Sequence, residues 1–145
     1  MTMDDLDTRI LAALSKDARV GVSTLARQMG LARTTVQARL DRLETTGVIA
    51  GYSVKLGDEA RLRRIRATVL LQVEPRSTVT LVARLKALSE VEIVHTTSGR
   101  FDMVLELACQ TTAELDETLD RIGGIPGVRS SESLIHLATK FDRRL

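Results

Sequence analysis

The residues between positions 22 and 51 have types and spacing suited to contacts with DNA. Apolar residues at helical spacing in 22–29 are followed by a Gly30–Leu31 turn and a second amphipathic segment, which together predict a helix-turn-helix. In the second segment Val36, Leu40 and Leu43 share one face, and polar or basic side chains cover the rest. Such a helix can enter the major groove. The predicted DNA-binding residues are Arg19, Arg33, Thr34, Thr35, Gln37, Ala38, Arg39 and Arg42.

Each side-chain type in this set predicts a different contact. Arginine pairs bidentately with guanine, glutamine pairs with adenine, and alanine or threonine can touch a thymine methyl group. Thr34, Gln37 and Arg39 are therefore the predicted base contacts. Arg19 and Arg42 are predicted to hold phosphates, which positions a protein without reading sequence. The alternative is that part of this set is only a solvated helix face.

A second group of polar residues surrounds an expected turn at positions 99–101. Gly99 can adopt a positive φ and let a ligand approach the backbone. Asp102 can pair with an α-ammonium group, and Arg100 or free turn amides can hold a carboxylate. Adjacent hydroxyls add hydrogen-bonding groups, so the candidate effector contacts here are Thr96, Thr97, Ser98, Gly99, Arg100 and Asp102. The alternative is an ordinary hairpin turn.

Composition excludes several function classes. Aromatic residues make up only 2% of the 145 residues, which disfavours single-stranded nucleic-acid binding through base stacking. Cys109 is the single cysteine, and His95 and His136 have no companion at metal-ligand spacing, so neither a metal nor a cofactor is expected. No catalytic constellation stands out, and the chain is predicted not to be an enzyme. The acidic start and the lack of a long apolar run predict a cytoplasmic protein without a membrane contact.

The helix-turn-helix must be positioned by a small N-terminal domain. We expect helices over Asp4–Lys16, Val22–Met29 and Arg33–Thr45, the last stopped by Gly47. Residues 48–55 contain strand-forming side chains and predict a short strand pair, or wing. The predicted domains are a winged helix-turn-helix domain over 1–56, a polar and basic linker over 57–66, and a second domain over 67–145.

The second domain alternates strands and helices. Strands are expected over residues 67–73, 91–97, 102–108 and 128–139, with one helix starting near Ser77 and another opened by Thr111 and Glu114 at capping-box spacing. The fold class is therefore α+β, with a C-terminal ferredoxin-like βαββαβ domain. RNA-binding domains of this topology carry aromatic residues on their central strands. Here those strands have none, so RNA binding is disfavoured.

Both faces of the expected sheet carry apolar residues, but only one face should be covered by the helices. Alternate residues from Ala67 to Val73, and from Met103 to Leu107, should pack under the helices. The opposite face still carries Leu70, Val104 and Ala108, which predicts a dimer built by face-to-face sheet packing. The alternative is a modestly apolar exposed face.

With both halves placed, the chain resembles feast/famine regulators of the Lrp/AsnC family over nearly its whole length. The resemblance rests on four groups of residues: Asp4–Asp5–Leu6–Asp7 with Ile10–Leu11, Leu14 and Arg19; Leu25–Ala26 through Gly30–Leu31; Val36, Arg39, Leu43–Glu44 and Gly47–Val48–Ile49 with Gly51–Tyr52; and Gly99–Arg100–Phe101–Asp102. The chain departs from the family at Ala32, where a serine usually caps the recognition helix, and at Ala18, where a glycine is common.

The resemblance implies a transcription regulator that binds double-stranded DNA. It also implies a homo-oligomer of C-terminal-domain dimers that assemble into octamers, with an amino acid or related metabolite bound near subunit interfaces. Ser131 and Ser133 lie where the family's last strand often carries threonines, which adds them to the effector contacts. The enzyme alternative is a tetrapyrrole decarboxylase of the same architecture, which should have a basic, histidine-bearing cavity. A third alternative is an assembly module without DNA affinity.

Overall fold

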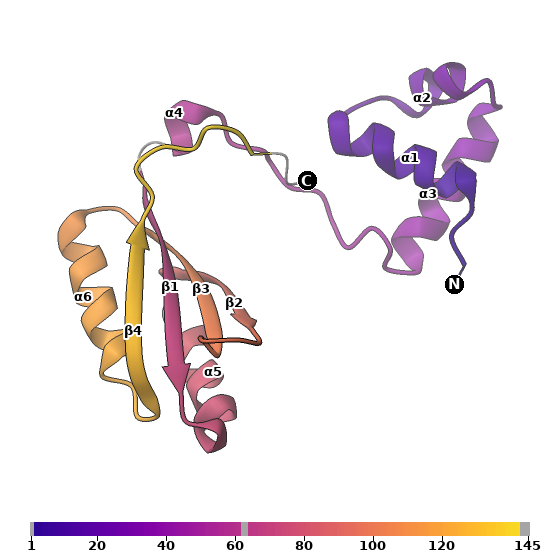
Figure 1. Cartoon of the computed structure of the whole chain (residues 1–145). Coiled ribbons are helices and arrows are strands. Elements are labelled where there is room, and N and C mark those ends of the chain that lie inside the picture. Colours follow the sequence, from indigo (N-terminus) through magenta and orange to yellow (C-terminus); the bar gives the residue numbers. More distant parts are fainter. Residues whose placement is uncertain (1, 62–63, 143–145) are drawn as a thin grey trace. The chain divides into compact units, whose positions relative to one another are not determined.

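The chain forms two compact units, the first ending at Lys55 and the second spanning Leu56–Asp142 (Figure 1). The computed structural model describes residues 2–61 and 64–142. The predicted order of elements is confirmed: a helical N-terminal domain precedes an α+β domain with a four-stranded antiparallel sheet.

Three helices make up the first unit: α1 (Asp5–Lys16), α2 (Val22–Met29) and α3 (Arg33–Thr45). Asp4 caps α1 through a capping box in which its side chain accepts from the Asp7 amide and the Asp7 side chain accepts from the Asp4 amide. The α2–α3 turn passes through Gly30 at φ 68°, a left-handed conformation that favours glycine. The buried side chains that join the helices are Ile10, Leu25, Ala26, Val36, Leu40 and Leu43.

The start of α3 shows the consequence of the missing serine. Ala32 is the N-cap, and it makes no side-chain hydrogen bond to the helix. An N-cap serine would satisfy one backbone donor and stabilise the helix by about 1 kcal/mol. The helix still begins at Arg33, because Val36, Leu40 and Leu43 are buried and hold it in place.

The predicted wing was wrong. No strand forms among residues 48–55, all of which the structure describes. The Ile49 amide donates to the Leu43 carbonyl at 2.9 Å, and the Tyr52 hydroxyl donates to the Glu44 carboxylate at 2.6 Å, so the segment folds back on the end of α3. Val54 is 83% exposed. An isolated two-stranded hairpin is marginal in water, and eight residues with little buried surface do not form one here.

The second unit has the predicted ferredoxin-like βαββαβ order. It contains α4 (Asp58–Arg61), β1 (Ile65–Val73), the 3₁₀ turn η1 (Pro75–Ser77), α5 (Thr78–Lys86), β2 (Val91–Thr96), β3 (Met103–Cys109), α6 (Thr112–Gly123) and β4 (Val128–Ile135). The strand order is β2-β3-β1-β4, with all neighbours antiparallel. Helix α4 and the start of β1 lie inside the predicted linker. Strand β4 ends at Ile135, which pairs with Ala67, and so stops before the predicted residue 139.

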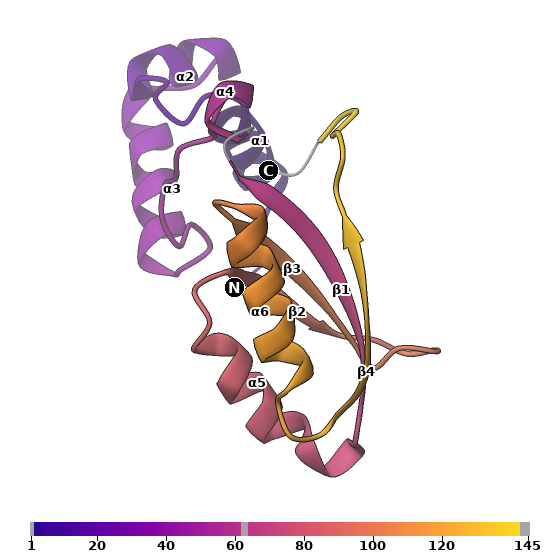
Figure 2. The same cartoon turned by 90° about the vertical axis from the view of Figure 1, so that its left-hand side faces the viewer.

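Helices α5 and α6 cover one face of the sheet (Figure 2). The predicted inward residues of β1 and β3 are all buried there. On α5, Leu81 and Leu85 face the core, while Val79 and Val82 are 84% and 37% exposed. The η1 turn directly precedes α5. On α6, the predicted cap is confirmed, since Thr111 accepts from the Glu114 amide at 3.1 Å.

The open face of the sheet is partly apolar. The register sets Leu70 opposite Val104, and Leu134 opposite Thr68. Leu134 is 50% exposed, whereas Ala108 is already buried.

Candidate nucleic-acid interface and effector site

The outer surface of α3 begins with the residues at its N-terminal end. Arg33, Thr34, Thr35 and Ala38 are exposed, as is Asp41 one turn later. The half-buried Gln37 donates from Nε2 to Asp41 Oδ1 at 2.7 Å, an (i, i+4) contact that orients its amide along the helix. Together these side chains offer hydroxyl, amide, methyl and guanidinium groups.

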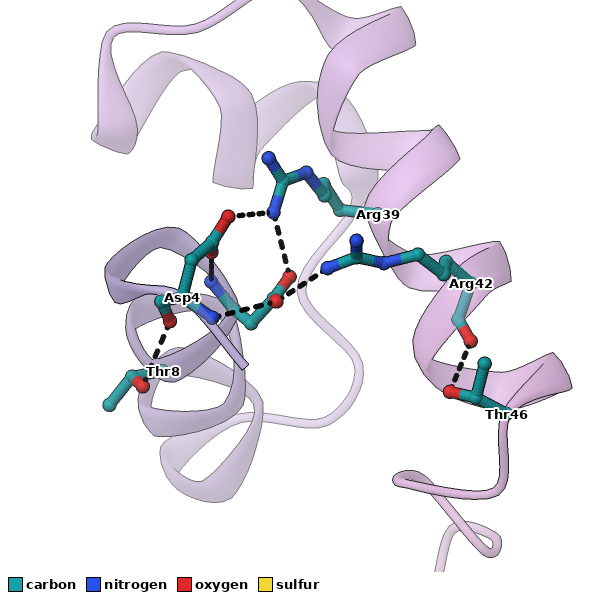
Figure 3. Close-up of polar contacts among 6 residues, drawn as sticks. Asp4, Thr8, Arg39, Arg42 and Thr46 are labelled. Atoms are coloured by element: carbon teal, nitrogen blue, oxygen red, sulfur yellow. Dashed lines mark hydrogen bonds and ion pairs between the residues drawn. The ribbon is translucent and has the colours of Figure 1, made fainter. Parts of the chain in front are cut away.

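Arg39 and Arg42 have partners within the chain (Figure 3). Arg39 Nη1 pairs with Asp4 Oδ2 and, at 3.1 Å, with Asp7 Oδ1. Arg42 Nη2 pairs with Asp7 Oδ2 at 2.5 Å. The Asp7 side chain is completely buried, while Arg39 and Arg42 are 29% and 41% exposed. Both guanidiniums therefore join α3 to the N-terminus of α1.

The ion pairs shift the pKa values of both Asp4 and Arg39. The hydrogen bond from Arg39, followed by the bond from the Asp7 amide, holds the pKa of Asp4 below its ordinary value. Asp4 and then Asp7 raise the pKa of Arg39 in return. The charged forms of these groups therefore stabilise one another.

Arg19 is set apart from α3 in the sequence. It is exposed in the turn after α1, and its backbone amide donates to Asp17 Oδ1 at 2.9 Å. This hydrogen bond fixes the backbone of the turn but does not involve the Arg19 guanidinium.

The turn at residues 99–101 is tied to β1 by two side chains. Gly99 has φ 119°, as its predicted role requires. Asp102 Oδ2 accepts from the Val73 amide at 2.8 Å, beside the register shift in the β1–β4 ladder. Gln72 Nε2 donates to the Arg100 carbonyl at 2.9 Å. The Arg100 guanidinium lies over the Phe101 ring, 5.3 Å from its centroid.

A shallow cavity of about 260 Å³ lies next to Asp102. Its lining combines a carboxylate, hydroxyls and apolar groups: Val73, Pro75, Thr78, Thr96, Thr97, Asp102 and Met103. Three of the predicted effector residues are thus brought together at one cavity. Ser98, Gly99 and Arg100 lie at the adjacent hairpin tip and do not line it.

Ser131 and Ser133 lie elsewhere in the same chain. The register sets them opposite Leu71 and Val69, on β4. Strand β1 lies between β4 and β3, so these two hydroxyls are on the opposite edge of the sheet from β2 and the residue 97–102 turn.

Several residues of both sites were missed by reasoning from sequence. Asp7 is absent from the predicted DNA-binding residues, although it shares a helical face with Ile10 and Leu14. A carboxylate on a buried face requires a charged or hydrogen-bonding partner, and that signal was available. For Val73 and Thr78 no sequence signal existed, because the cavity forms where the end of β1 meets the start of α5.

No helix in the described part of the chain is long and apolar enough to cross a membrane.

Comparisons with known proteins cover both units. Residues 3–44 match the model of the AsnC-type helix-turn-helix domain, and residues 66–145 match the Lrp/AsnC ligand binding domain. The chain is 30% identical to the HTH-type transcriptional regulator FL11 of Pyrococcus abyssi, over 96% of this chain and 92% of that protein. It is 32% identical to the HTH-type transcriptional regulator LrpA of Mycobacterium tuberculosis, over 98% of this chain and 95% of LrpA.

Solved structures share the fold. E. coli AsnC superposes with a TM-score of 0.89 at 24% identity, covering 100% of this chain and 99% of AsnC. The transcriptional regulator NMB0573 of Neisseria meningitidis, solved as a complex with L-Met, gives 0.87 at 21% identity, covering 97% of this chain and 94% of that one. These relatives are regulators, and the enzyme alternative is not favoured. The chain belongs to the Lrp/AsnC family and is a transcriptional regulator with a helix-turn-helix DNA-binding domain and a ligand-binding domain.

Proposed function

We propose that this regulator binds an amino acid in the cavity beside Asp102 and that the bound ligand changes its assembly or its affinity for DNA. The observation that carries the proposal is the lining of that cavity, which combines one carboxylate, three threonines and an apolar wall. Its volume of about 260 Å³ falls just below the roughly 300–1,000 Å³ of clefts for drug-sized ligands, which favours a small metabolite.

The lining suggests how an amino acid would bind. One oxygen of Asp102 is occupied by the Val73 amide, so we assign the other oxygen to the ligand's ammonium group. The hydroxyl of Thr96 and the nearby turn amides are the assigned carboxylate partners, with Ser98, Gly99 and Arg100 at the mouth. The Thr97 hydroxyl donates to the Phe101 carbonyl at 2.7 Å, so Thr97 is assigned to the wall of the cavity. Val73, Pro75 and Met103 would contact an aliphatic side chain. The L-Met complex of the Neisseria meningitidis relative supports this class of ligand.

For DNA we assign the exposed N-terminal surface of α3. Arg33, Thr34, Thr35, Gln37 and Ala38 are the proposed groove contacts, and Arg19 is a proposed phosphate contact. Arg39 and Arg42 are not assigned to direct contact, in contrast to the prediction from sequence, because carboxylates of α1 already bind their guanidiniums. We also propose that this DNA-binding regulator acts in the cytoplasm.

We further propose a dimer formed by the open sheet face, with octamers built from such dimers. Leu70, Val104 and the half-exposed Leu134 supply an apolar surface for a second sheet. Ser131 and Ser133 would then reach an effector only in a site completed by another copy. A two-fold dimer would require a roughly palindromic DNA site with half-sites about 10 bp apart, or a multiple of that spacing.

The effector proposal is tested by thermal melts of the wild type against each of the twenty amino acids. A ligand at a hundred times its Kd stabilises by about 2.7 kcal/mol, which raises Tm by several degrees. Asp102→Asn keeps an acceptor for the Val73 amide but loses the charge, so it should fold and lose the shift. Asp116→Asn, an exposed carboxylate on α6, is the matched control and should keep it. If Asp102→Asn kept the full ligand-induced rise in Tm, Asp102 would not be a ligand contact.

The DNA proposal is tested by fluorescence anisotropy with duplexes selected by the protein from a random pool. Arg19→Ala should lower affinity and reduce the slope of log K against log salt by about 0.9, the value for one lost phosphate contact. Thr34→Ala should reduce discrimination between selected and random duplexes. Arg84→Ala, an exposed arginine of α5, should change neither. Absence of binding to any duplex would favour the assembly-module alternative.

A further inference from the structure

Two carboxylates and two guanidiniums form a closed cluster between α1 and α3 (Figure 3). The cluster consists of Asp4, Asp7, Arg39 and Arg42. Both oxygens of Asp7 are used, since Oδ1 accepts from Arg39 while Oδ2 accepts from Arg42 and from the Asp4 amide at 3.1 Å. Two negative and two positive charges cancel within it.

The burial of Asp7 makes the cluster more than a surface ion pair. Its side chain has no solvent exposure, so its charge is compensated by these partners and the N-terminus of α1 and not by water. If Arg39 and Arg42 swung out to phosphates, a buried carboxylate would be left unpaired. Exposed groove residues of α3 have no such constraint.

The spacing along α3 separates two rows of side chains. Thr35, Arg39 and Arg42 follow one another at (i, i+4, i+7), so the two arginines share the flank that meets α1. Thr34 and Ala38 lie on the neighbouring row and are exposed. The arginines are thus on the side of α3 that meets α1, and the row formed by Thr34 and Ala38 faces outward.

We propose that Asp7, assisted by Asp4, is a positioning residue for DNA recognition: it fixes α3 through Arg39 and Arg42 and withholds both cations from the DNA backbone. This inference rests on the proposed DNA contacts of α3. The cluster sets the angle at which the groove residues are presented. It also lowers the sequence-independent part of DNA affinity, because a neutralised guanidinium releases no counterion from DNA.

The test compares Asp4→Asn and Asp7→Asn with Asp5→Asn. Asp5 lies in the same helical turn, is exposed, and loses the same charge on substitution, so it is a matched control. Affinity for random-sequence duplexes and for the selected duplex is measured by anisotropy at several salt concentrations. Circular dichroism verifies that each variant is folded.

The expected result is specific to a positioning role. Freeing one guanidinium steepens the salt slope on random duplexes by up to about 0.9 and raises that affinity by up to about eightfold at 0.1 M salt. The preference for the selected duplex falls at the same time. Arg39→Ala lowers selected-duplex affinity but leaves the salt slope at its wild-type value.

Two results would overturn the inference. One is equal slopes in Asp4→Asn, Asp7→Asn and Asp5→Asn. The other is a slope reduced by about 0.9 in Arg39→Ala, which would make Arg39 a direct phosphate contact. If Asp7→Asn fails to fold, Asp4→Asn and Arg39→Ala decide, since Asp4 is 48% exposed. A wild type that binds no duplex would instead refute the proposed function.

Discussion

Replacing Gly127 with alanine is expected to destabilise the C-terminal unit strongly. Gly127 precedes β4 and has φ 99°, a conformation that side chains rarely adopt. A Cβ added there would stand 2.3 Å from Ser77 Cβ and 2.5 Å from Ser77 Oγ. The Gly127 carbonyl also accepts from the Glu74 amide at 2.8 Å. The two backbone segments therefore approach more closely than any other residue allows.

The expected size follows from these two separate penalties. A non-glycine residue held at an unfavourable φ costs about 1–3 kcal/mol. Overpacking costs about 1–3 kcal/mol more, because Ser77 Cβ is attached to the backbone and cannot rotate away as its hydroxyl can. Moving the backbone apart would instead lose the hydrogen bond from Glu74, worth about 1 kcal/mol. We expect a loss of about 3 kcal/mol, which lowers Tm by 12 °C or more at about 4–8 °C per kcal/mol.

Urea denaturation and thermal melts measure this loss, and a double substitution separates its parts. Ser77→Gly combined with Gly127→Ala removes the clash but keeps the strained φ, so it should recover about half of the lost stability. Gly123→Ala is the control, because that glycine ends α6 in open space without a positive φ. It should change stability by less than about 1 kcal/mol. If Gly127→Ala were as stable as this control, the close approach would be refuted.

Three further perturbations have defined outcomes. Leu105→Ala removes a fully buried side chain at the centre of the sheet and should cost about 2–5 kcal/mol in urea denaturation, whereas a cost below 1 kcal/mol would contradict the packing. The hydrogen bond to Glu44 raises the pKa of Tyr52, the single tyrosine, so ultraviolet titration should give a midpoint above 10 that falls in Glu44→Ala. Because the pKa of Asp4 is lowered in the folded state, its contribution is present above about pH 4 and lost as pH falls through the lowered value. The Tm difference between wild type and Asp4→Asn should shrink on acidification, and a constant difference would exclude the effect.

Much of the fold followed from local patterns. The bounds of α2 and α3, the βαββαβ order and the Thr111 cap depend on apolar periodicity and capping residues that a short window contains. The predicted wing failed because strand formers in residues 48–55 have no partner strand in the described chain.

In the candidate effector site, some residues could be predicted from sequence and some contacts could not. Thr96, Thr97 and Asp102 could be chosen from sequence because they flank a turn marked by Gly99. The Asp102 bond to the Val73 amide could not, because it joins residues 29 positions apart.

The sequence by itself determined the order of helices and strands, the exposed polar surface of α3 and the glycine turns, because each depends on neighbours within a few residues. The tertiary structure decided which charges meet. From its side-chain type and its place on α3, Arg39 was expected to contact the DNA groove. In the structure it pairs instead with Asp4, which lies 35 residues away in the sequence. Pairing of charges depends on distance and burial in space, and both are fixed only when the buried side chains of α1 and α3 pack together.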